Sequence, residues 1–209
     1  MKIAVFGASG RTGRHVVEQA LAAGHEVVAF ARTPSRLGVE HMHLTVVQGD
    51  VQDKAQVNQA VAGVDAVIST LGPTENKPDY QVTAGTENII AAMYAHGVRR
   101  LVISAGAGVG DPNDAPKFMN HVVNLLLKLV ARHVYEDMKR VVELVRASNL
   151  DWVIVRVPML TDDAPTGVVQ VGYVGKGMGM RISRADMAEF MLRQVSDDAY
   201  LHKAPAISN

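Results

Sequence analysis

Short apolar runs rich in β-branched residues alternate along the chain with longer segments in which apolar residues return at every third or fourth position. Continuous apolar runs are typical of strands buried on both faces of a parallel sheet. The sequence places such runs at 2–6, 26–31, 44–48, 66–71, 100–104 and 152–157. Each run is expected to form a strand of one parallel sheet.

Helical periodicity fills the intervals between these runs. Over 14–23 the apolar residues share one helix face, and Gly24 stands where a helix C-cap belongs. The same spacing predicts a helix over 79–96. Asp53 is expected to cap a further helix over 53–62.

Strict alternation of strand and helix produces βαβ units, whose right-handed crossovers cover both faces of a sheet. We therefore predict an α/β protein with a three-layer, doubly wound parallel sheet, formed by residues 1–209 as a single domain. Residues 158–209 are expected to add a wall of a substrate cleft and a C-terminal helix, which the capping-box pair Ser183 and Asp186 opens. The turn-rich part of this segment is equally consistent with a plain surface excursion.

Three glycines stand at three-residue spacing directly after the first predicted strand: Gly7, Gly10 and Gly13. In a βαβ unit the first permits a tight turn, the second lets a pyrophosphate reach the main chain, and the third lets the helix pack closely on the sheet. Free N–H groups at the start of the helix then face the phosphates. This context favours a dinucleotide site over a merely tight loop.

Arginine, rather than an acidic residue, follows the second predicted strand. A site for NAD usually has an aspartate or glutamate about 20 residues after the glycine loop, where it binds the ribose 2′-hydroxyl. This chain has Arg32 there, with Arg36 close by and Arg11 inside the glycine loop. Guanidinium groups suit a phosphate, which predicts NADP(H) rather than NAD(H). The alternative is that these arginines only solvate a surface loop.

The ends of the next two strands fit the same ligand. Asp50 and Val51 follow the third strand, where a carboxylate can accept a hydrogen bond from the adenine amino group. Leu71 and Gly72 follow the fourth strand, and glycine again permits a close approach to the backbone. Asp50 is equally well explained as a turn residue.

The composition excludes several other classes of function. Lysine plus arginine, 21 residues, balances aspartate plus glutamate, also 21, so no net field favours nucleic acid or an anionic membrane. The chain has no cysteine, which excludes thiol chemistry and weakens any zinc site, so no metal is expected. The most membrane-like stretch, 122–131 within a helical region expected over 115–147, carries Lys128 and is about half the length that spans a bilayer. We expect a cytoplasmic protein, either a monomer or a small homo-oligomer.

These motifs resemble those of the short-chain dehydrogenase/reductase superfamily, in its atypical NAD(P)H-binding branch. Within that branch the chain is most similar to the biliverdin-IXβ reductases, also called NADPH-dependent flavin reductases. The matching stretches run in order over nearly the whole chain: "FGASGRTG", "ARTPSRL", "GDV", "AVISTLG", "NIIAAMYAHGV", "SNLDWVIVRVP" and "ISRADMAEFML". The resemblance implies a single Rossmann domain and NADPH as cofactor.

The resemblance also implies contacts to the cofactor, position by position. Arg32 and Arg36 would hold the 2′-phosphate, and the residues after the sixth strand would lie near the nicotinamide. The other contacts that it implies come from the glycine loop and the strand ends. The residues concerned are Ser9, Arg11, Thr12, Asp50, Val51, Leu71, Gly72, Val157, Pro158 and Met159.

Many members of the superfamily use a serine after the fifth strand together with a Tyr-x-x-x-Lys helix. The corresponding residues are Ser104, Tyr135 and Lys139. Residues four apart share a helix face, so the ammonium of Lys139 can stabilise a Tyr135 phenolate for proton transfer. The biliverdin/flavin reductases depart from this pattern: their serine lies slightly later, at the position of Gly106, and they do not depend on the Tyr-Lys pair. Tyr135 and Lys139 are therefore either catalytic or part of a solvated helix face.

Two functions remain open on the sequence. The first is an NADPH-dependent oxidoreductase that transfers hydride to a flat conjugated acceptor such as a flavin, a biliverdin-like tetrapyrrole or a quinone. The second is a non-catalytic NADP(H)-sensing regulator like the nitrogen-metabolite-repressor relatives in the same superfamily. A complete Ser/Tyr/Lys set favours the enzyme. A small-molecule acceptor is the expected partner, with neither nucleic acid nor a membrane.

Overall fold

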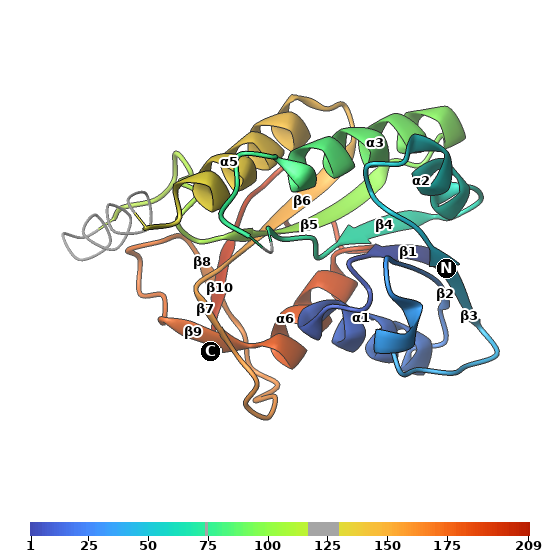
Figure 1. Ribbon diagram of the computed structural model, residues 1–209. Helices are drawn as coiled ribbons and strands as arrows, with labels where there is room; N and C mark the ends of the chain where they lie inside the picture. The colour runs from blue at the N-terminus through green and yellow to red at the C-terminus, as the bar shows by residue number, and fades with distance from the viewer. Residues whose placement is uncertain (74, 117–129) are drawn as a thin grey trace.

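An eight-stranded sheet forms the middle of three layers in the computed structural model, which describes residues 1–73, 75–116 and 130–209 (Figure 1). Its strand order is β3-β2-β1-β4-β5-β6-β10-β8, and all neighbours run parallel except β8, which is antiparallel to β10. The strands are β1 (Lys2–Phe6), β2 (Glu26–Ala31), β3 (Leu44–Gln48), β4 (Ala66–Ser69), β5 (Arg100–Gly106), β6 (Asp151–Val157), β8 (Gln170–Gly172) and β10 (Ala206–Ser208). This order reverses direction between β1 and β4, so the predicted doubly wound α/β fold is confirmed.

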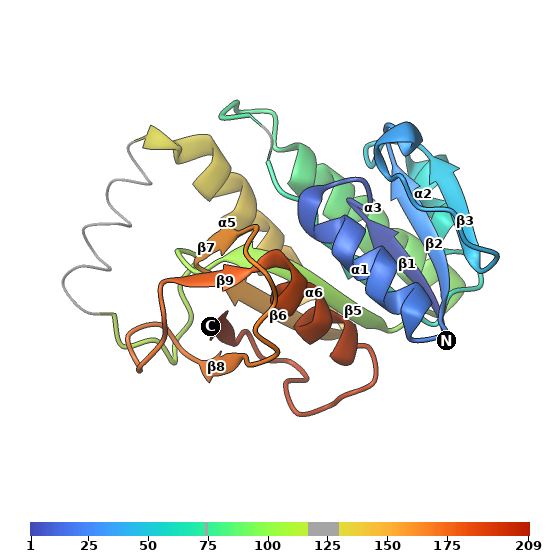
Figure 2. The same cartoon turned by 90° about the horizontal axis from the view of Figure 1, so that it is seen from below.

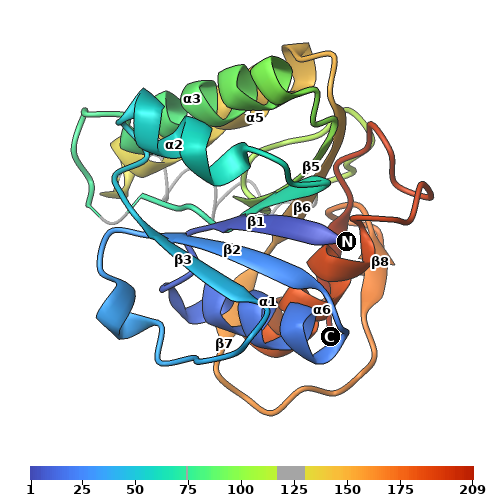
Figure 3. The ribbon, with the colours of Figure 1, turned by 90° about the vertical axis from the view of Figure 1, so that its right-hand side faces the viewer.

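Helices cover both faces of the sheet. α2, α3 and α5 lie on one face, and α1 and α6 lie side by side on the other (Figures 1, 2 and 3). Each outer layer therefore seals one side of the central strands, as the continuous apolar runs require. The helices are α1 (Arg11–Ala22), α2 (Lys54–Val61), α3 (Gln81–His96), α5 (Arg132–Ala147) and α6 (Arg184–Arg193), with a 3₁₀ turn, η1, at Pro34–Arg36.

The helix ends follow the predicted caps closely. The side chain of Asp53 accepts hydrogen bonds from the N–H groups of Ala55 and Gln56 at 2.9 and 3.1 Å, so it is the N-cap of α2. Ser183 likewise accepts from the N–H of Asp186 at 3.0 Å and opens α6. α1 begins at Arg11, directly after its N-cap residue Gly10, and thus three residues earlier than the predicted start at residue 14. Its first N–H groups consequently point toward the glycine turn.

β4 and the predicted helical region 115–147 also differ from the predicted boundaries. β4 ends at Ser69 rather than at residue 71, because Thr70 leaves the sheet and donates through its N–H and its hydroxyl to the carbonyl of Phe6, at 3.0 and 3.1 Å. Within the predicted helical region 115–147, α5 covers Arg132–Ala147, whereas residues 115 and 116 are not helical. Residues 117–129, which include most of the apolar stretch 122–131, lie outside the described residues.

The C-terminal segment adds short strands of three residues each. β10 joins the sheet beside β6, and β8 pairs with β10 at the sheet's edge. β7 (Met159–Thr161) and β9 (Arg181–Ser183) form a separate parallel pair near α6 (Figure 2). None of the helices within residues 1–73, 75–116 and 130–209 is long and apolar enough to cross a membrane.

Candidate functional site

A cleft of about 550 Å³ opens beyond the carboxyl ends of β1, β2, β3 and β4. In an open α/β sheet this edge, at the reversal of strand order, is where ligands bind. Most of the residues predicted to bind a cofactor line this cleft together: Gly7, Ser9, Gly10, Arg32, Arg36, Asp50, Val51, Leu71 and Gly72. The structure therefore brings four separate strand ends to one place.

The glycine turn is packed against the end of β4. Gly7 has a φ of +77°, and a Cβ there would lie 2.9 Å from Thr70 Oγ1. A Cβ on Gly13 would lie only 2.1 Å from the carbonyl oxygen of Gly7, whereas one on Gly10 would meet just that oxygen, at 3.1 Å. Gly7 and Gly13 are thus required by the packing of the turn itself. Gly10 meets that one oxygen and otherwise faces the cleft.

This difference predicts that alanine at Gly13 mainly lowers stability, whereas alanine at Gly10 mainly weakens dinucleotide binding. Gly13→Ala should lower the free energy of unfolding by about 1–3 kcal/mol, because the new methyl overlaps the Gly7 carbonyl. Gly10→Ala should cost less stability than Gly13→Ala, because its methyl meets only the Gly7 carbonyl oxygen, at 3.1 Å. It should weaken dinucleotide binding, because that methyl projects where a diphosphate would approach. Urea unfolding and a fluorescence titration with NADPH measure the two effects. Equal loss of stability in both variants would contradict this division of roles.

Arg32 and Arg36 stand at the end of the cleft formed by β2 and η1. Neither guanidinium forms an ion pair with a carboxylate within the described residues. Two unneutralised cations beside a glycine turn are suited to a phosphate.

The other predicted cofactor residues lie outside the cleft lining. Arg11 lines an adjoining hollow and forms an ion pair with Asp162 at 3.3 Å. Thr12 is 9% exposed, and Gly13 lies beneath the turn. Pro158 follows β6, away from these strand ends.

Asp50 serves as a turn residue and still faces the cleft. Its Oδ1 accepts a hydrogen bond from the N–H of Gln52 at 2.9 Å, and its own N–H donates to Gln56 Oε1 at 2.8 Å. Its side chain is exposed and lines the cleft. The turn role is therefore observed, and an adenine contact through the second carboxylate oxygen remains a prediction.

An acidic side chain that sequence reasoning missed closes the far end of the cleft. Asp137 of α5 is 3% exposed, and its carboxylate accepts hydrogen bonds from the N–H groups of Val82 and Thr83 at 3.2 and 2.9 Å. It thereby caps the start of α3 in place of Tyr80, the residue at the N-cap, whose own side chain makes no capping bond. Cap and helix are more than 50 residues apart in sequence, so local pattern could not reveal the pair.

The three predicted catalytic residues lie on β5 and α5, outside the cleft lining. Ser104 is in β5, and Tyr135 and Lys139 are one turn apart on α5. Lys139 Nζ lies 3.5 Å from Glu143 Oε1, on an exposed part of the helix. Their roles therefore remain predictions.

The sequence profile of a family described as NAD(P)H-binding matches residues 7–198. The chain belongs to this family. Membership confirms the class of cofactor that the sequence predicts, a nicotinamide dinucleotide.

Two curated reductases are similar to about half of this chain. The (4-alkanoyl-5-oxo-2,5-dihydrofuran-3-yl)methyl phosphate reductase of Streptomyces griseus subsp. griseus is 42% identical over 118 residues, which cover 56% of this chain and 38% of that protein. The 2-alkyl-3-oxoalkanoate reductase of Stenotrophomonas maltophilia is 36% identical over 116 residues, which cover 52% of this chain and 34% of that protein. The chain thus matches little more than a third of the length of these relatives.

Solved structures of similar fold span nearly the whole chain. A short-chain dehydrogenase/reductase from Veillonella parvula in complex with NADP superposes with a TM-score of 0.80 at 16% identity, covering 100% of this chain and 94% of that one. An anaerobilin reductase from Escherichia coli O157:H7 has a TM-score of 0.76 at 21% identity, covering 100% and 97%. At these identities the likeness shows the fold that the NAD(P)H-binding family shares.

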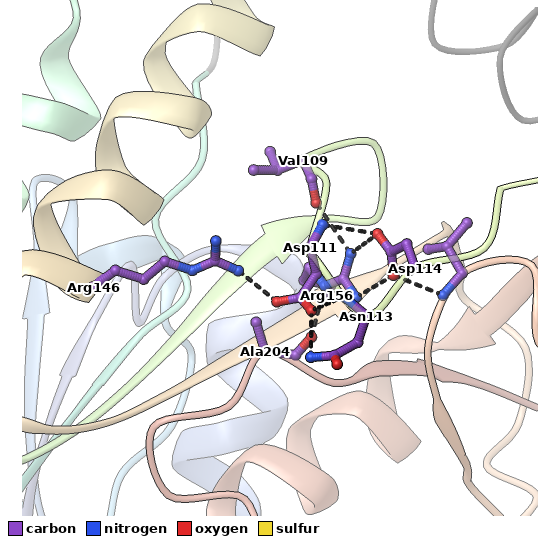
Figure 4. A network of polar contacts seen from close by, with 8 residues as sticks. Val109, Asp111, Asn113, Asp114, Arg146, Arg156 and Ala204 are labelled. Atoms are coloured by element: carbon purple, nitrogen blue, oxygen red, sulfur yellow. Dashed lines mark hydrogen bonds and ion pairs between the residues drawn. The ribbon is translucent and has the colours of Figure 1, made fainter.

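A buried network of ion pairs and hydrogen bonds surrounds Arg156 of β6 (Figure 4). Arg156 of β6 is fully buried, and its Nη1 and Nη2 donate to the two carboxylate oxygens of Asp114 at 2.7 and 2.8 Å. Its Nε donates to the carbonyl of Ala204 at 2.7 Å, and Nη1 also donates to that of Val109 at 3.1 Å. The guanidinium therefore ties the segment after β5 to β6 and to the C-terminal segment.

Two further contacts extend this network. Asp114 also accepts from the N–H groups of Val174 and Asp111, at 3.0 and 2.8 Å. The carboxylate of Asp111 in turn accepts from Arg146 of α5 at 2.6 Å. Burial raises the pKa of the Asp114 carboxyl, but the hydrogen bonds from Arg156 and from these two N–H groups outweigh it and hold the pKa below its ordinary value.

The lowered pKa of Asp114 predicts an acid-sensitive contribution to stability. A carboxyl whose pKa is lower in the folded state stabilises the fold above its unfolded-state pKa of about 4, and this contribution is lost as the pH falls through the folded-state pKa. Urea unfolding should therefore show the wild-type free energy falling with pH below about 4, more steeply than that of Asp114→Asn. The same pH slope in both proteins would contradict the assignment.

Proposed function

We propose that this protein is an NADPH-dependent reductase that passes hydride to a flat conjugated acceptor such as a flavin, a linear tetrapyrrole or a quinone. The observation that carries the proposal is the cleft, in which the glycine turn shares one sheet edge with the guanidinium groups of Arg32 and Arg36, neither of which forms an ion pair with another described residue. Several of the similar proteins are named as reductases or dehydrogenases, which supports an enzyme over a regulator.

The residues of the cleft fit NADP(H). The part of the cleft beside Gly10 and the first-turn N–H groups of α1 would take the diphosphate. Arg32 and Arg36 would hold the 2′-phosphate, and Asp50 with Val51 would flank the adenine. Leu71 and Gly72 would face the adjoining ribose.

The chemistry would take place beyond this cleft. With the adenosine half at β2 and β3, the nicotinamide half would extend along the carboxyl edge toward β5 and β6, where Ser104 and Pro158 lie. When bound, NADPH supplies the hydride. Tyr135 would hold the proton that the reduced acceptor takes up, Lys139 would orient it, and Ser104 would position the acceptor. Residues 158–183 would form the wall of the acceptor site.

The test mixes the protein with NADPH and, in parallel, a flavin, a linear tetrapyrrole and quinones, and follows the loss of nicotinamide absorbance in the near ultraviolet. Oxidation with at least one of them is expected. Tyr135→Phe should lower kcat if the phenol donates the proton, whereas Tyr94→Phe, on the exposed side of α3, should not. Tight NADPH binding without oxidation by any acceptor would argue for the regulator instead.

A further inference from the structure

A carboxylate connects the glycine turn to the C-terminal wall. Asp162 follows β7, and its two oxygens contact different arginines: Oδ2 lies 3.3 Å from Arg11 Nη1, and Oδ1 lies 3.0 Å from Arg184 Nη1. Arg11 is the first residue of α1 and Arg184 is the first residue of α6. Both guanidinium groups stand at the positive end of a helix dipole, where a cation is disfavoured without a counter-ion.

The two halves of this bridge differ in how firmly they are held. The side chain of Arg184 is 8% exposed, so its charge depends on Asp162 for neutralisation. The side chains of Arg11 and Asp162 are 72% and 65% exposed, and an exposed ion pair contributes little to stability. The contact to Arg184 is therefore the anchor, and the contact to Arg11 is the one that a competing anion can replace.

The contact between Arg11 and Asp162 lies beside the predicted position of the 2′-phosphate. A hollow of about 330 Å³ adjoins the cleft and is lined by Ser9, Gly10, Arg11, Arg36 and Asp162, among others. Ser9, Gly10 and Arg36 line the cleft as well. Arg11 and Arg36 thus face one shared space, in which Asp162 is the carboxylate that Arg11 contacts. Arg14 and Glu18 also line this space, and they form an ion pair with each other.

We propose that Asp162 is a specificity-determining residue that competes with the 2′-phosphate of NADP(H) for the guanidinium of Arg11. In the free protein Arg11 is paired with Asp162. When the 2′-phosphate lies against Arg36, Arg11 moves to the phosphate, whose charge and three acceptor oxygens bind a guanidinium more strongly than an exposed carboxylate does, and Asp162 keeps Arg184. The inference rests on the proposed function, since it requires NADP(H) in the cleft.

The test compares dissociation constants for NADPH and NADH, measured by fluorescence titration at one fixed ionic strength. Asp162→Asn should bind NADPH about three- to fivefold more tightly than the wild type and leave NADH unchanged, because only the 2′-phosphate gains the freed guanidinium. Asp163→Asn is the matched control: it removes the same charge from the next residue, which makes no ion pair or side-chain hydrogen bond within the described residues. Its NADPH affinity should stay within about twofold of the wild type.

Arg11→Gln supplies an independent arm that leaves the Asp162–Arg184 pair, and hence the fold, intact. It should weaken NADPH binding about threefold, and Asp162→Asn should then have no effect in the Arg11→Gln background. The inference is overturned if Asp162→Asn matches Asp163→Asn, if its gain persists without Arg11, or if NADH gains equally. A wild-type protein that binds no NADPH would instead refute the proposed function.

Discussion

Replacing Arg156 by methionine is expected to lower the free energy of unfolding by about 3–5 kcal/mol, because it leaves the Asp114 carboxylate buried without its counter-ion. The carbonyls of Val109 and Ala204 also lose their donor. Methionine is of similar length and apolar, so cavity formation contributes little and the charge imbalance dominates. Urea unfolding followed by circular dichroism measures the change.

Two further variants test whether the unpaired buried charge causes this loss of stability. Arg193→Met removes an exposed guanidinium that lies 3.8 Å from Glu189, and it should cost less than about 1 kcal/mol. Adding Asp114→Leu to Arg156→Met should recover part of the lost stability, because neither charge is then buried alone. Recovery stays partial, since the N–H groups of Asp111 and Val174 lose their acceptor. A cost at Arg156 no larger than that at Arg193 would refute a supporting role for the network.

The central strands were predictable because burial on both faces leaves a plain signature. β1 and β2 match the apolar runs of the sequence to the residue, and β6 differs only by beginning at Asp151. β3 also matches its run, although it is an edge strand without a buried residue. Caps such as Asp53 were predictable for a related reason: a side chain that bonds N–H groups two and three residues away is encoded locally. β7, β9 and β10 have three residues each, too few for a period, and are defined by their pairing partners.

Arg156 shows what a single sequence conceals. The run "WVIVRV" predicts a buried strand, and the arginine inside it is a visible anomaly. Its partners, Val109, Asp114 and Ala204, lie more than 40 residues away along the chain in both directions. A charged residue within an apolar run therefore indicated that a partner must exist, but only the fold reveals which one it is.

The residues of the candidate site also fall into those that the sequence pattern could place and those that only the fold reveals. Residues that directly follow strands, such as Arg32 and Asp50, could be placed because the fold class dictates which edge they share. Asp137 and Asp162 could not, because each acts on an element that reaches it only through helix packing or an excursion of the chain. Arg11 was predicted as a phosphate contact, and the structure shows the carboxylate with which such a contact must compete.

Changing Arg32 to aspartate is expected to weaken NADPH binding by about a hundredfold or more, because a carboxylate then replaces a guanidinium beside the 2′-phosphate. NADH should bind as well as before or better, since a carboxylate at the end of β2 can accept a hydrogen bond from the ribose 2′-hydroxyl. Fluorescence titrations with both dinucleotides give the ratio of affinities, which should reverse in favour of NADH.

Arg193→Asp tests whether this reversal is local. It makes the same change of charge at the last residue of α6, outside the cleft and at the opposite end of that helix from Arg184. Because surface charges at such distances are screened at physiological salt, it should leave the ratio of affinities for NADPH and NADH unchanged. Circular dichroism should show both variants folded, since neither side chain is buried. If Arg32→Asp retained the wild-type preference, the phosphate would have to lie elsewhere, and the adjoining hollow, which Arg11, Arg14 and Arg36 line, would be the place to look for it.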